Sequence, residues 1–381
     1  MTHILFIDLH NNQSLARLPS LFRDDGISCS VLARKGKALL YSAVPTHSFE
    51  FPPDIMQRKL LNFARILCDA IHRCTPDLLM TNDEVLTKNL LTLRRKLRTS
   101  EDLGNELHPL LLPLLEKSFL ADDQFYSREN SLTLAAKSGF PVPDGAIVTN
   151  WSDLEKSARA FGYPFFLKVS FEGAGEGVAH ISSPTALSVT ATRLANTGIH
   201  LDERYPALLQ KPVEGVELTV NFSAWNGELL AFDVFKPLER REKTGPASVL
   251  QSMYRPHYEE AVQTLVKSLE YTGFGGIDAF ETTSSGLPTA IEINLRPTSS
   301  LSVAKQINSP IIKRFSGCLT NNRPTDTQAS HSRLDQTIAL FPDEYLRDNN
   351  SPYMSKYLVN APWNDPGLMR YLLKVAGLSN G

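Results

Sequence analysis

The stretch TGFGGIDAFETTSSGLPTAIEINLRPTSS, residues 272–300, decides the fold and the function expected of this chain. Its first part, GGIDAFETT, has the β-branched and aromatic content of a strand, SSGLP supplies turn residues, and TAIEINL resumes the extended pattern. Glu292 and Asn294 are two positions apart and therefore share one face of the second strand. Asp278 reaches the same place if the two strands pair, and Arg296 continues that face.

Two interpretations of this acidic face stay open. Ionised carboxylates among apolar neighbours are costly unless something neutralises them. A hard divalent cation with oxygen ligands, bridging to phosphate, would neutralise them. A solvated strand face with an ion pair to Arg296 explains the same residues equally well, because carboxylates commonly face water.

Length and composition limit the class of protein. A chain of 381 residues exceeds one ordinary core and suits two or three domains. Its net charge of -2 gives no general attraction to nucleic acid or to an anionic membrane, so neither partner is expected. The sequence has no apolar run of about 20 residues and no signal-peptide pattern at its start. The four cysteines form no CxxC pair, which argues against zinc and disulfides and favours the reducing cytoplasm.

Strand and helix signals alternate through the first 118 residues. Residues 3–9 and 27–33 predict buried strands, and residues 76–84 predict a strand that ends in a polar tip. This alternation favours a parallel doubly wound sheet, in which the ends of the strands face a ligand crevice. Asp83 and Glu84 lie at such an end, where capping of the next helix is the commoner role and substrate contact is the alternative.

A glycine-rich hairpin is the second informative segment. YPFFLKVS predicts a strand that carries Lys168 in an apolar setting, FEGAGEG predicts a turn, and VAHIS predicts the returning strand. A strand follows the glycines where a Rossmann or P-loop fingerprint would need a helix, so neither fingerprint is present. The backbone amides of Gly173, Gly175 and Gly177 are free to lie on phosphate, and an ordinary hairpin is the equal alternative.

Residues 206–235 predict a strand, a short linker and a β-meander with a turn at Asn226-Gly227. A strand that exits into a linker leaves backbone groups free to pair with the edge of a base, so an adenine slot is expected there. Glu217 lies just after the linker. The segment 236–248 reads as a basic loop, either solvated or anion-binding. Its cationic side chains are Lys236, Arg240, Arg241 and Lys243. Residues 310–381 carry no evident chemistry.

The order of these features resembles the ATP-grasp superfamily, in particular its carboxylate–amine ligases of the amino-acid and peptide type. The resemblance covers roughly residues 119–300 and depends on three motifs, DAF…AIEINLRP, FFLKVS…GAGEGV and LLQKPVEGVE. It implies an α/β chain in three parts. These are a Rossmann-like domain at 1–118, an ATP-grasp domain at 119–309 with α+β lobes at about 119–210 and 211–309, and a small C-terminal extension at 310–381.

The resemblance also implies roles for individual residues. The expected ligands of Mg²⁺, or of Mn²⁺ in its place, are Asp278, Glu292 and Asn294. The residues expected around ATP are Arg128, Lys168, Gly173, Gly175, Gly177, Gln210, Lys211, Val213 and Glu217. The catalytic positive charges are expected from Arg296, Arg240 and Arg241. Three departures from the family pattern are Arg128 in place of a lysine, Gln210 in place of a glutamate, and Gly275-Gly276-Ile277 where some ligases have a basic residue.

The implied activity is an ATP-dependent ligation in which a carboxylate becomes an acyl phosphate and an amine then forms the amide, with ADP and phosphate released. The implied substrates are a small carboxylate and an amine, with amino acids as candidates and a carrier protein as another acceptor. A homodimer is left open. A carboxylase that uses carboxyphosphate and an ATP-binding module without chemistry are the alternatives. A biosynthetic role in the cytoplasm is expected.

Overall fold

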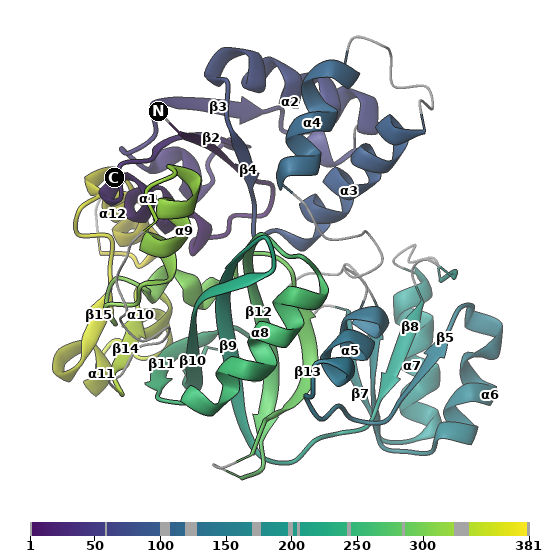
Figure 1. The fold of residues 1–381 in the computed structure, drawn as a ribbon. Coiled ribbons are helices and arrows are strands. Elements are labelled where there is room, and N and C mark those ends of the chain that lie inside the picture. Colours follow the sequence, from purple (N-terminus) through teal and green to yellow (C-terminus); the bar gives the residue numbers. More distant parts are fainter. Residues whose placement is uncertain are drawn as a thin grey trace.

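The computed structural model describes residues 2–57, 59–99, 107–118, 128–169, 177–196, 201–203, 206–241, 245–283, 286–323 and 335–378. Its strands form three sheets, of four, seven and four strands. Figure 1 shows the N-terminal sheet above the seven-stranded sheet, with the smaller four-stranded sheet to one side and the C-terminal segment on the other. None of the helices in these ranges has both the length and the apolar character that a membrane crossing needs.

The N-terminal sheet is entirely parallel, in the order β3-β2-β1-β4. Its strands are β1 (His3–Asp8), β2 (Ser28–Arg34), β3 (His47–Phe51) and β4 (Leu78–Met80). Successive residues of β1 enter different cores, because a strand buried on both faces alternates between them: Ile4 and Phe6 join one core, and Leu5 joins the other. The expected doubly wound sheet is confirmed. The helices around it are α1 (Leu18–Asp24), α2 (Leu60–Cys74), α3 (Glu84–Arg98) and α4 (His108–Ser118).

The smaller sheet has the order β5-β8-β6-β7 and is antiparallel. Its strands are β5 (Gly145–Val148), β6 (Phe165–Val169), β7 (Val178–Ile181) and β8 (Ala207–Gln210), with the helices α6 (Trp151–Phe161) and α7 (Pro184–Asn196). The predicted glycine-rich hairpin is confirmed in its two strands, since Lys168 on β6 pairs with Val178 on β7. Gly173 and Gly175 lie outside the described residues.

The large sheet has the order β13-β12-β9-β10-β11-β14-β15. Its strands are β9 (Val216–Trp225), β10 (Glu228–Arg240), β11 (Ala247–Met253), β12 (Gly273–Glu281), β13 (Thr289–Asn294), β14 (Thr337–Leu340) and β15 (Leu358–Asn360). The helices α5 (Arg128–Lys137) and α8 (Glu259–Ser268) pack against this sheet. The interpretation of residues 236–248 as a loop is wrong at its start, because β10 continues to Arg240 and pairs with β11 there.

The C-terminal segment connects the large sheet to the N-terminal sheet. Its strands β14 and β15 extend the large sheet, and α9 (Ile311–Leu319) and α12 (Pro366–Val375) share one core with β1 and β2 (Figure 1). Two short helices, α10 (Asp343–Arg347) and α11 (Pro352–Lys356), lie between β14 and β15 in the chain. The 3-10 turns of the chain include η1 (Leu15–Arg17), η2 (Ala38–Tyr41), η3 (Ile55–Gln57), η6 (Pro256–Tyr258) and η7 (Ser299–Val303).

Candidate active site

The acidic face predicted from the sequence is formed by two neighbouring strands. β12 and β13 pair antiparallel, and Asp278 stands directly opposite Glu292 in their register. Paired residues project from the same face of a sheet, so the two carboxylates lie side by side. The Asp278 carboxylate accepts hydrogen bonds from Thr219 Oγ1 at 3.0 Å and from Asn294 Nδ2 at 3.2 Å. The strand pairing on which this prediction depends is therefore present.

The electrostatics of this face suit a bound cation. Burial, and then the nearby Glu292 carboxylate, raise the pKa of Asp278 above its usual range. A divalent ion between the two acids would offset that repulsion, and the Asn294 amide lies beside Asp278, with its nitrogen toward the carboxylate. Within the described ranges, no three His, Cys, Asp or Glu side chains form a metal-binding group.

The smaller sheet reaches the acidic face through two polar side chains. Lys168 Nζ and Gln210 Nε2 each donate to the carbonyl of Ile291, both at 3.2 Å, and Ile291 directly precedes Glu292. Both residues are buried, with Lys168 4% and Gln210 2% exposed. A buried ammonium is costly unless it meets an oxygen partner or an anion. The structure therefore brings Lys168 and Gln210 together at the junction of the two lobes.

Among the described residues, the others predicted to surround ATP do not share the contact with Ile291 that Lys168 and Gln210 make. The Lys211 ammonium donates to the carbonyl of Gly162 at 2.7 Å and lies 4.7 Å from the centre of the Phe161 ring, so its charge is directed into the smaller lobe. Val213 lies in the linker between β8 and β9, and the Gly177 carbonyl accepts from Val169 N at 2.8 Å. Arg128 begins α5, but its side chain lies outside the described residues.

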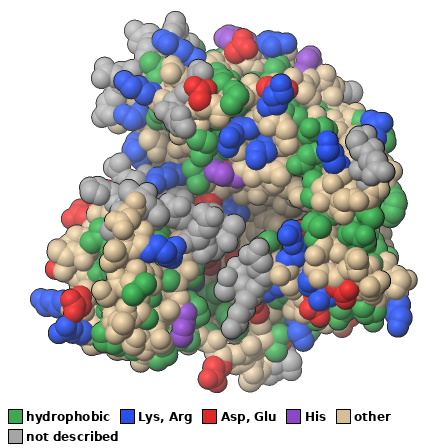
Figure 2. Space-filling model, turned by 180° about the vertical axis from the view of Figure 1, so that it is seen from behind, with side chains coloured by type: hydrophobic (Ala, Val, Ile, Leu, Met, Phe, Trp, Pro, Cys, Tyr) green, Lys and Arg blue, Asp and Glu red, His purple; other side chains and the backbone are tan. Residues whose placement is uncertain are grey.

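Two of the three predicted arginines line one large cleft. Arg240 and Arg296 border a cavity of about 810 Å³ between the N-terminal sheet and the end of the large sheet. Arg240 also contacts the Glu217 carboxylate and the Gly245 carbonyl, and Arg296 Nη2 lies 3.6 Å from Glu84 Oε2. Arg241, in contrast, pairs with Asp343 at 3.5 Å. Figure 2 shows the molecule from the side opposite to Figure 1, with a central hollow that has basic side chains around it.

The cleft wall contains residues that the sequence reasoning missed. They come from the loop after β1, from η1, from the loop between β4 and α3, and from the C-terminal segment, and they include His10, Asn12, Gln13, Arg17, Asn82, Asp343 and Asn360. Residues 310–381 therefore contribute to the cleft, where no chemistry was expected of them. In the described part of the chain, Gln13, Arg17 and Asn82 each keep one buried polar atom without a hydrogen-bond partner. The wall thus has unused hydrogen-bonding capacity.

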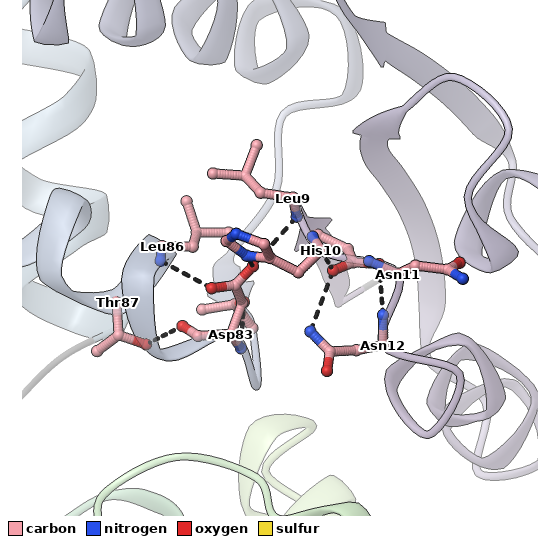
Figure 3. Close-up of polar contacts among 9 residues, drawn as sticks. Leu9, His10, Asn11, Asn12, Asp83, Leu86 and Thr87 are labelled. Atoms are coloured by element: carbon pink, nitrogen blue, oxygen red, sulfur yellow. Dashed lines mark hydrogen bonds and ion pairs between the residues drawn. The ribbon is translucent and has the colours of Figure 1, made fainter. Parts of the chain in front are cut away.

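A histidine–aspartate pair lies at one end of the cleft (Figure 3). His10 Nδ1 is 2.6 Å from Asp83 Oδ2, and the hydrogen bond to the Asp83 carboxylate raises the pKa of His10. Asp83 also caps α3 by accepting from Leu86 N at 2.9 Å, which confirms the capping role, and it lines the cavity. The signal available in the sequence was a polar tip on each of two strands, DLH after β1 and NDE after β4.

The glycines that stand in place of a basic residue have a packing reason. A Cβ on Gly275 would lie 2.2 Å from the Phe222 ring, and a Cβ on Gly276 would lie 2.3 Å from the Thr298 side chain. Thr298 in turn donates to Asn221 at 2.6 Å. No side chain fits at these two positions of β12, so the positive charge of this site must come from other residues.

Comparison with known proteins identifies the fold. No protein family model matches the chain, and no curated protein matches it in sequence. Among solved structures, a carboxyaminoimidazole ribonucleotide synthase from Aspergillus clavatus, complexed with ATP, has a TM-score of 0.61 at 15% identity, covering 88% of this chain and 81% of its own. An L-amino acid ligase from Bacillus licheniformis has a TM-score of 0.54 at 13% identity, with 84% and 76% covered.

A third similar structure is the biotin carboxylase domain of the 2-oxoglutarate carboxylase from Hydrogenobacter thermophilus, a dimer with MgADP, ADP and bicarbonate. Its TM-score is 0.61 at 15% identity, and the match covers 88% of this chain and 73% of that one. These neighbours are ATP-grasp enzymes. The chain has the ATP-grasp fold, as its motifs predicted.

Proposed function

We propose that this protein is an ATP-dependent ligase that converts a substrate carboxylate into an acyl phosphate and joins it to an amine, releasing ADP and phosphate. One observation carries the proposal. The register-paired acids Asp278 and Glu292 lie beside Asn294, and the neighbouring carbonyl of Ile291 accepts Lys168 from the other lobe. Such an arrangement suits a nucleotide's phosphates, held between a cation site and a buried ammonium.

The nucleotide and the metal are part of this proposal. The likeness to structures solved with ATP or MgADP supports ATP as the substrate and Mg²⁺ as its ion. The ion would be held by Asp278, Glu292 and Asn294. The base would lie along the linker near Gln210 and Val213, between β8 and β9. Glu217 and Lys211 were expected to contact the ribose and the base. In this structure their side chains instead contact Arg240 and the carbonyl of Gly162.

The chain's own residues supply most of the chemistry. A bound Mg²⁺ would offset the charge that spreads over the transferred phosphoryl group. Lys168 at the lobe junction and Arg296 at the cleft add positive charge on either side of the acids. Arg240, fixed by Glu217 on the same cleft, is placed to attract an anionic substrate. Catalysis is then mainly a matter of positioning, with no side-chain nucleophile required.

The cleft favours small polar substrates. Its lining is rich in amide and hydroxyl groups, and Gln13, Arg17 and Asn82 hold unused polar atoms beneath it. The guanidinium groups of Arg240 and Arg296 on the lining offer donors that a carboxylate accepts, and the amide side chains of the lining offer oxygens that accept from an ammonium. Amino acids combine both groups and are the first candidates. An acceptor on a carrier protein would need to present the same groups at the cleft.

The test is a screen for phosphate release with pairs of amino acids, with bicarbonate as a further arm and mass spectrometry of the products. We expect ADP and phosphate to form together with an amide of one pair. The Asp278→Asn variant, still folded, should form none of these products. AMP with pyrophosphate would contradict the proposal. ADP release that depends on bicarbonate would replace it with carboxylation.

A further inference from the structure

His10 is a titratable group of the cleft for which the reaction so far has no role. It lies in the loop that follows β1, and its side chain is 44% exposed where it lines the cavity. Asp83, in contrast, is almost completely buried, with its side chain 2% exposed. A fixed carboxylate that holds an imidazole facing a cleft is the arrangement by which proteins orient a histidine for proton transfer.

The hydrogen bonds around Asp83 determine the protonation of the ring. Leu9 N donates to Asp83 Oδ2 at 3.3 Å and Leu86 N to Oδ1 at 2.9 Å, so both oxygens act as acceptors. The partner atom of the ring, His10 Nδ1, therefore carries the hydrogen of the 2.6 Å contact. In the neutral ring this leaves Nε2 without a proton and able to accept one.

A second carboxylate fixes the loop itself. Asp8, at the end of β1, accepts the backbone N–H groups of His10 at 3.1 Å, Asn11 at 3.1 Å and Asn12 at 2.9 Å (Figure 3). The loop therefore holds its backbone in one conformation without a helix or strand. His10 is therefore held at two points: Asp8 binds its backbone N–H, and Asp83 binds Nδ1 of its ring.

The position of His10 relative to the phosphoryl end follows from a short chain of contacts. Arg296 lies two residues after Asn294 and borders the same cavity as His10. Its guanidinium lies 3.6 Å from Glu84, the residue that follows Asp83 in the chain. Arg296 and His10 therefore both line the cleft, and both contact the start of α3, through Glu84 and Asp83.

We propose that His10, oriented by Asp83, is the general base that deprotonates the amine attacking the acyl phosphate. This inference rests on the proposed ligase function. The amine nitrogen forms a bond to the carbonyl carbon, and the bond from that carbon to the phosphate oxygen breaks, with its electron pair leaving on phosphate. An ammonium and an acyl phosphate give an amide, hydrogen phosphate and one proton. His10 Nε2 takes that proton, and the other proton lost by nitrogen leaves with phosphate.

The charged groups around His10 suit this role. Asp83 and Asp8 favour its protonated form, whereas Arg34 and partial burial oppose that form. The net effect raises the pKa of His10, with the Asp83 hydrogen bond as the main cause. A base whose pKa lies near the working pH is effective, because it is both free and strong enough to accept a proton. Asp83 is then a positioning residue and His10 a catalytic one.

The experiment compares two small nucleophiles on the same acyl phosphate. Hydroxylamine is largely unprotonated at neutral pH and needs no base, whereas ammonium must be deprotonated before it attacks. Wild type, His10→Asn and the control His72→Asn, which changes an exposed histidine of α2, are given ATP, Mg²⁺ and each amino acid as the carboxylate. Hydroxamate and primary amide are then measured. We expect His10→Asn to lower amide formation about 100-fold while hydroxamate formation stays within about twofold of wild type.

The results separate this inference from the function on which it rests. Equal loss of both products in His10→Asn, no loss of either, or a wild type that forms hydroxamate but no amide would overturn the role of His10 and leave the ligase intact. A wild type that forms no hydroxamate with any carboxylate would overturn both. Asp83→Asn should move the inflection of the amide rate to lower pH, since the histidine loses its ion pair. An unchanged pH profile would remove the positioning role.

Discussion

At the scale of single residues, the two acids of the large sheet are held close together against their mutual repulsion. Asp278 faces Glu292 across one strand pair, and its pKa is raised to about 6 by burial and by that neighbour. Repulsion between two neighbouring carboxylates destabilises a folded protein, and a cation that binds between them removes this cost. The acids therefore indicate a binding site more strongly than a structural role.

Asp278→Asn should make the metal-free protein more stable at neutral pH and insensitive to Mg²⁺. The folded-state pKa of Asp278 lies above the unfolded value, so its contribution to stability is complete below pH 4 and is lost as pH rises through about 6. The loss should be on the order of 1–2 kcal/mol, because partial solvent contact reduces the full effect of the shift.

The measurement for this variant is thermal unfolding at pH 4 and pH 7, with and without Mg²⁺ and ATP. We expect wild type to gain in melting temperature from the ligands and the variant not to gain. Thr219 and Asn294 remain as partners of the new amide, so the fold should be kept. A variant that is less stable than wild type at pH 7, or that still responds to Mg²⁺, would contradict the metal assignment.

Single residues differ in how far the sequence could predict them. The period of two within one strand placed Glu292 and Asn294 together, and a short hairpin brought Asp278 to them. His10 and Asp83 are 73 positions apart and meet only because β1 and β4 are parallel neighbours. Nothing local in the sequence reports which strands of a parallel sheet are adjacent, so this pair required the structure.

At the scale of elements, β12 has no room for a side chain at two of its positions. Gly275 faces the Phe222 ring of β9, and Gly276 lies under Thr298. Thr298 directly precedes η7 and lies two residues after Arg296, which lines the cleft. Glycine in a strand interior lowers intrinsic strand stability, and close approach of a neighbouring group is the usual reason for it.

Gly275→Ala should destabilise the protein by about 1–3 kcal/mol, because the new methyl group overlaps the Phe222 ring. Chemical denaturation measures the change. The double variant Gly275→Ala with Phe222→Leu removes the overlapping ring atoms and should be more stable than the sum of the two single changes predicts. Strictly additive effects would show that the ring is not what excludes the side chain.

Lys168→Met should weaken ATP binding by at least about tenfold while the fold is retained, since methionine fills the apolar surroundings but loses the charge that faces the phosphates. Lys211→Met is the matched control, because its ammonium already lies on Gly162 and on Phe161. Calorimetric titration with ATP and Mg²⁺ measures both. Equal losses in the two variants would contradict the different roles assigned to these lysines.

Element prediction from the sequence followed the strength of local signals. The turn at Asn226-Gly227 was predicted because its two residues are a common turn pair, and both adopt positive φ angles. The strands β11, β14 and β15 were not predicted. Their pairing joins distant parts of the chain in one sheet, and β14 and β15 are only four and three residues long. Such strands are stabilised by their neighbours more than by their own composition.

At the scale of the whole molecule, the C-terminal segment connects the N-terminal sheet to the large sheet. Asp365 caps α12 through Leu368 N at 3.1 Å and also accepts from Ala43 N at 2.9 Å and Ser42 Oγ at 2.5 Å. These bonds cross from the end of the chain to the N-terminal domain. The same two regions share one core, so the walls of the cleft are held by contacts far from it.

Asp365→Ala should cost about 2–4 kcal/mol, because it removes a helix cap and leaves buried donors of the N-terminal domain unpaired. Trp363→Ala, which changes a side chain 77% exposed, is the control and should cost little. Denaturation followed by tryptophan fluorescence and by circular dichroism measures both variants. If Asp365→Ala were as stable as the control, the C-terminal helix would not secure the N-terminal domain.

The central claim is that a carboxylate becomes an acyl phosphate between the acids of β12 and β13 and the lysine of β6. Isotope transfer tests it most directly, with a carboxylate substrate labelled with ¹⁸O on both oxygens and the released phosphate analysed by mass spectrometry. Acyl phosphate formation predicts that each phosphate released carries one ¹⁸O from the carboxylate, together with ADP. Unlabelled phosphate, or AMP in place of ADP, would contradict the claim.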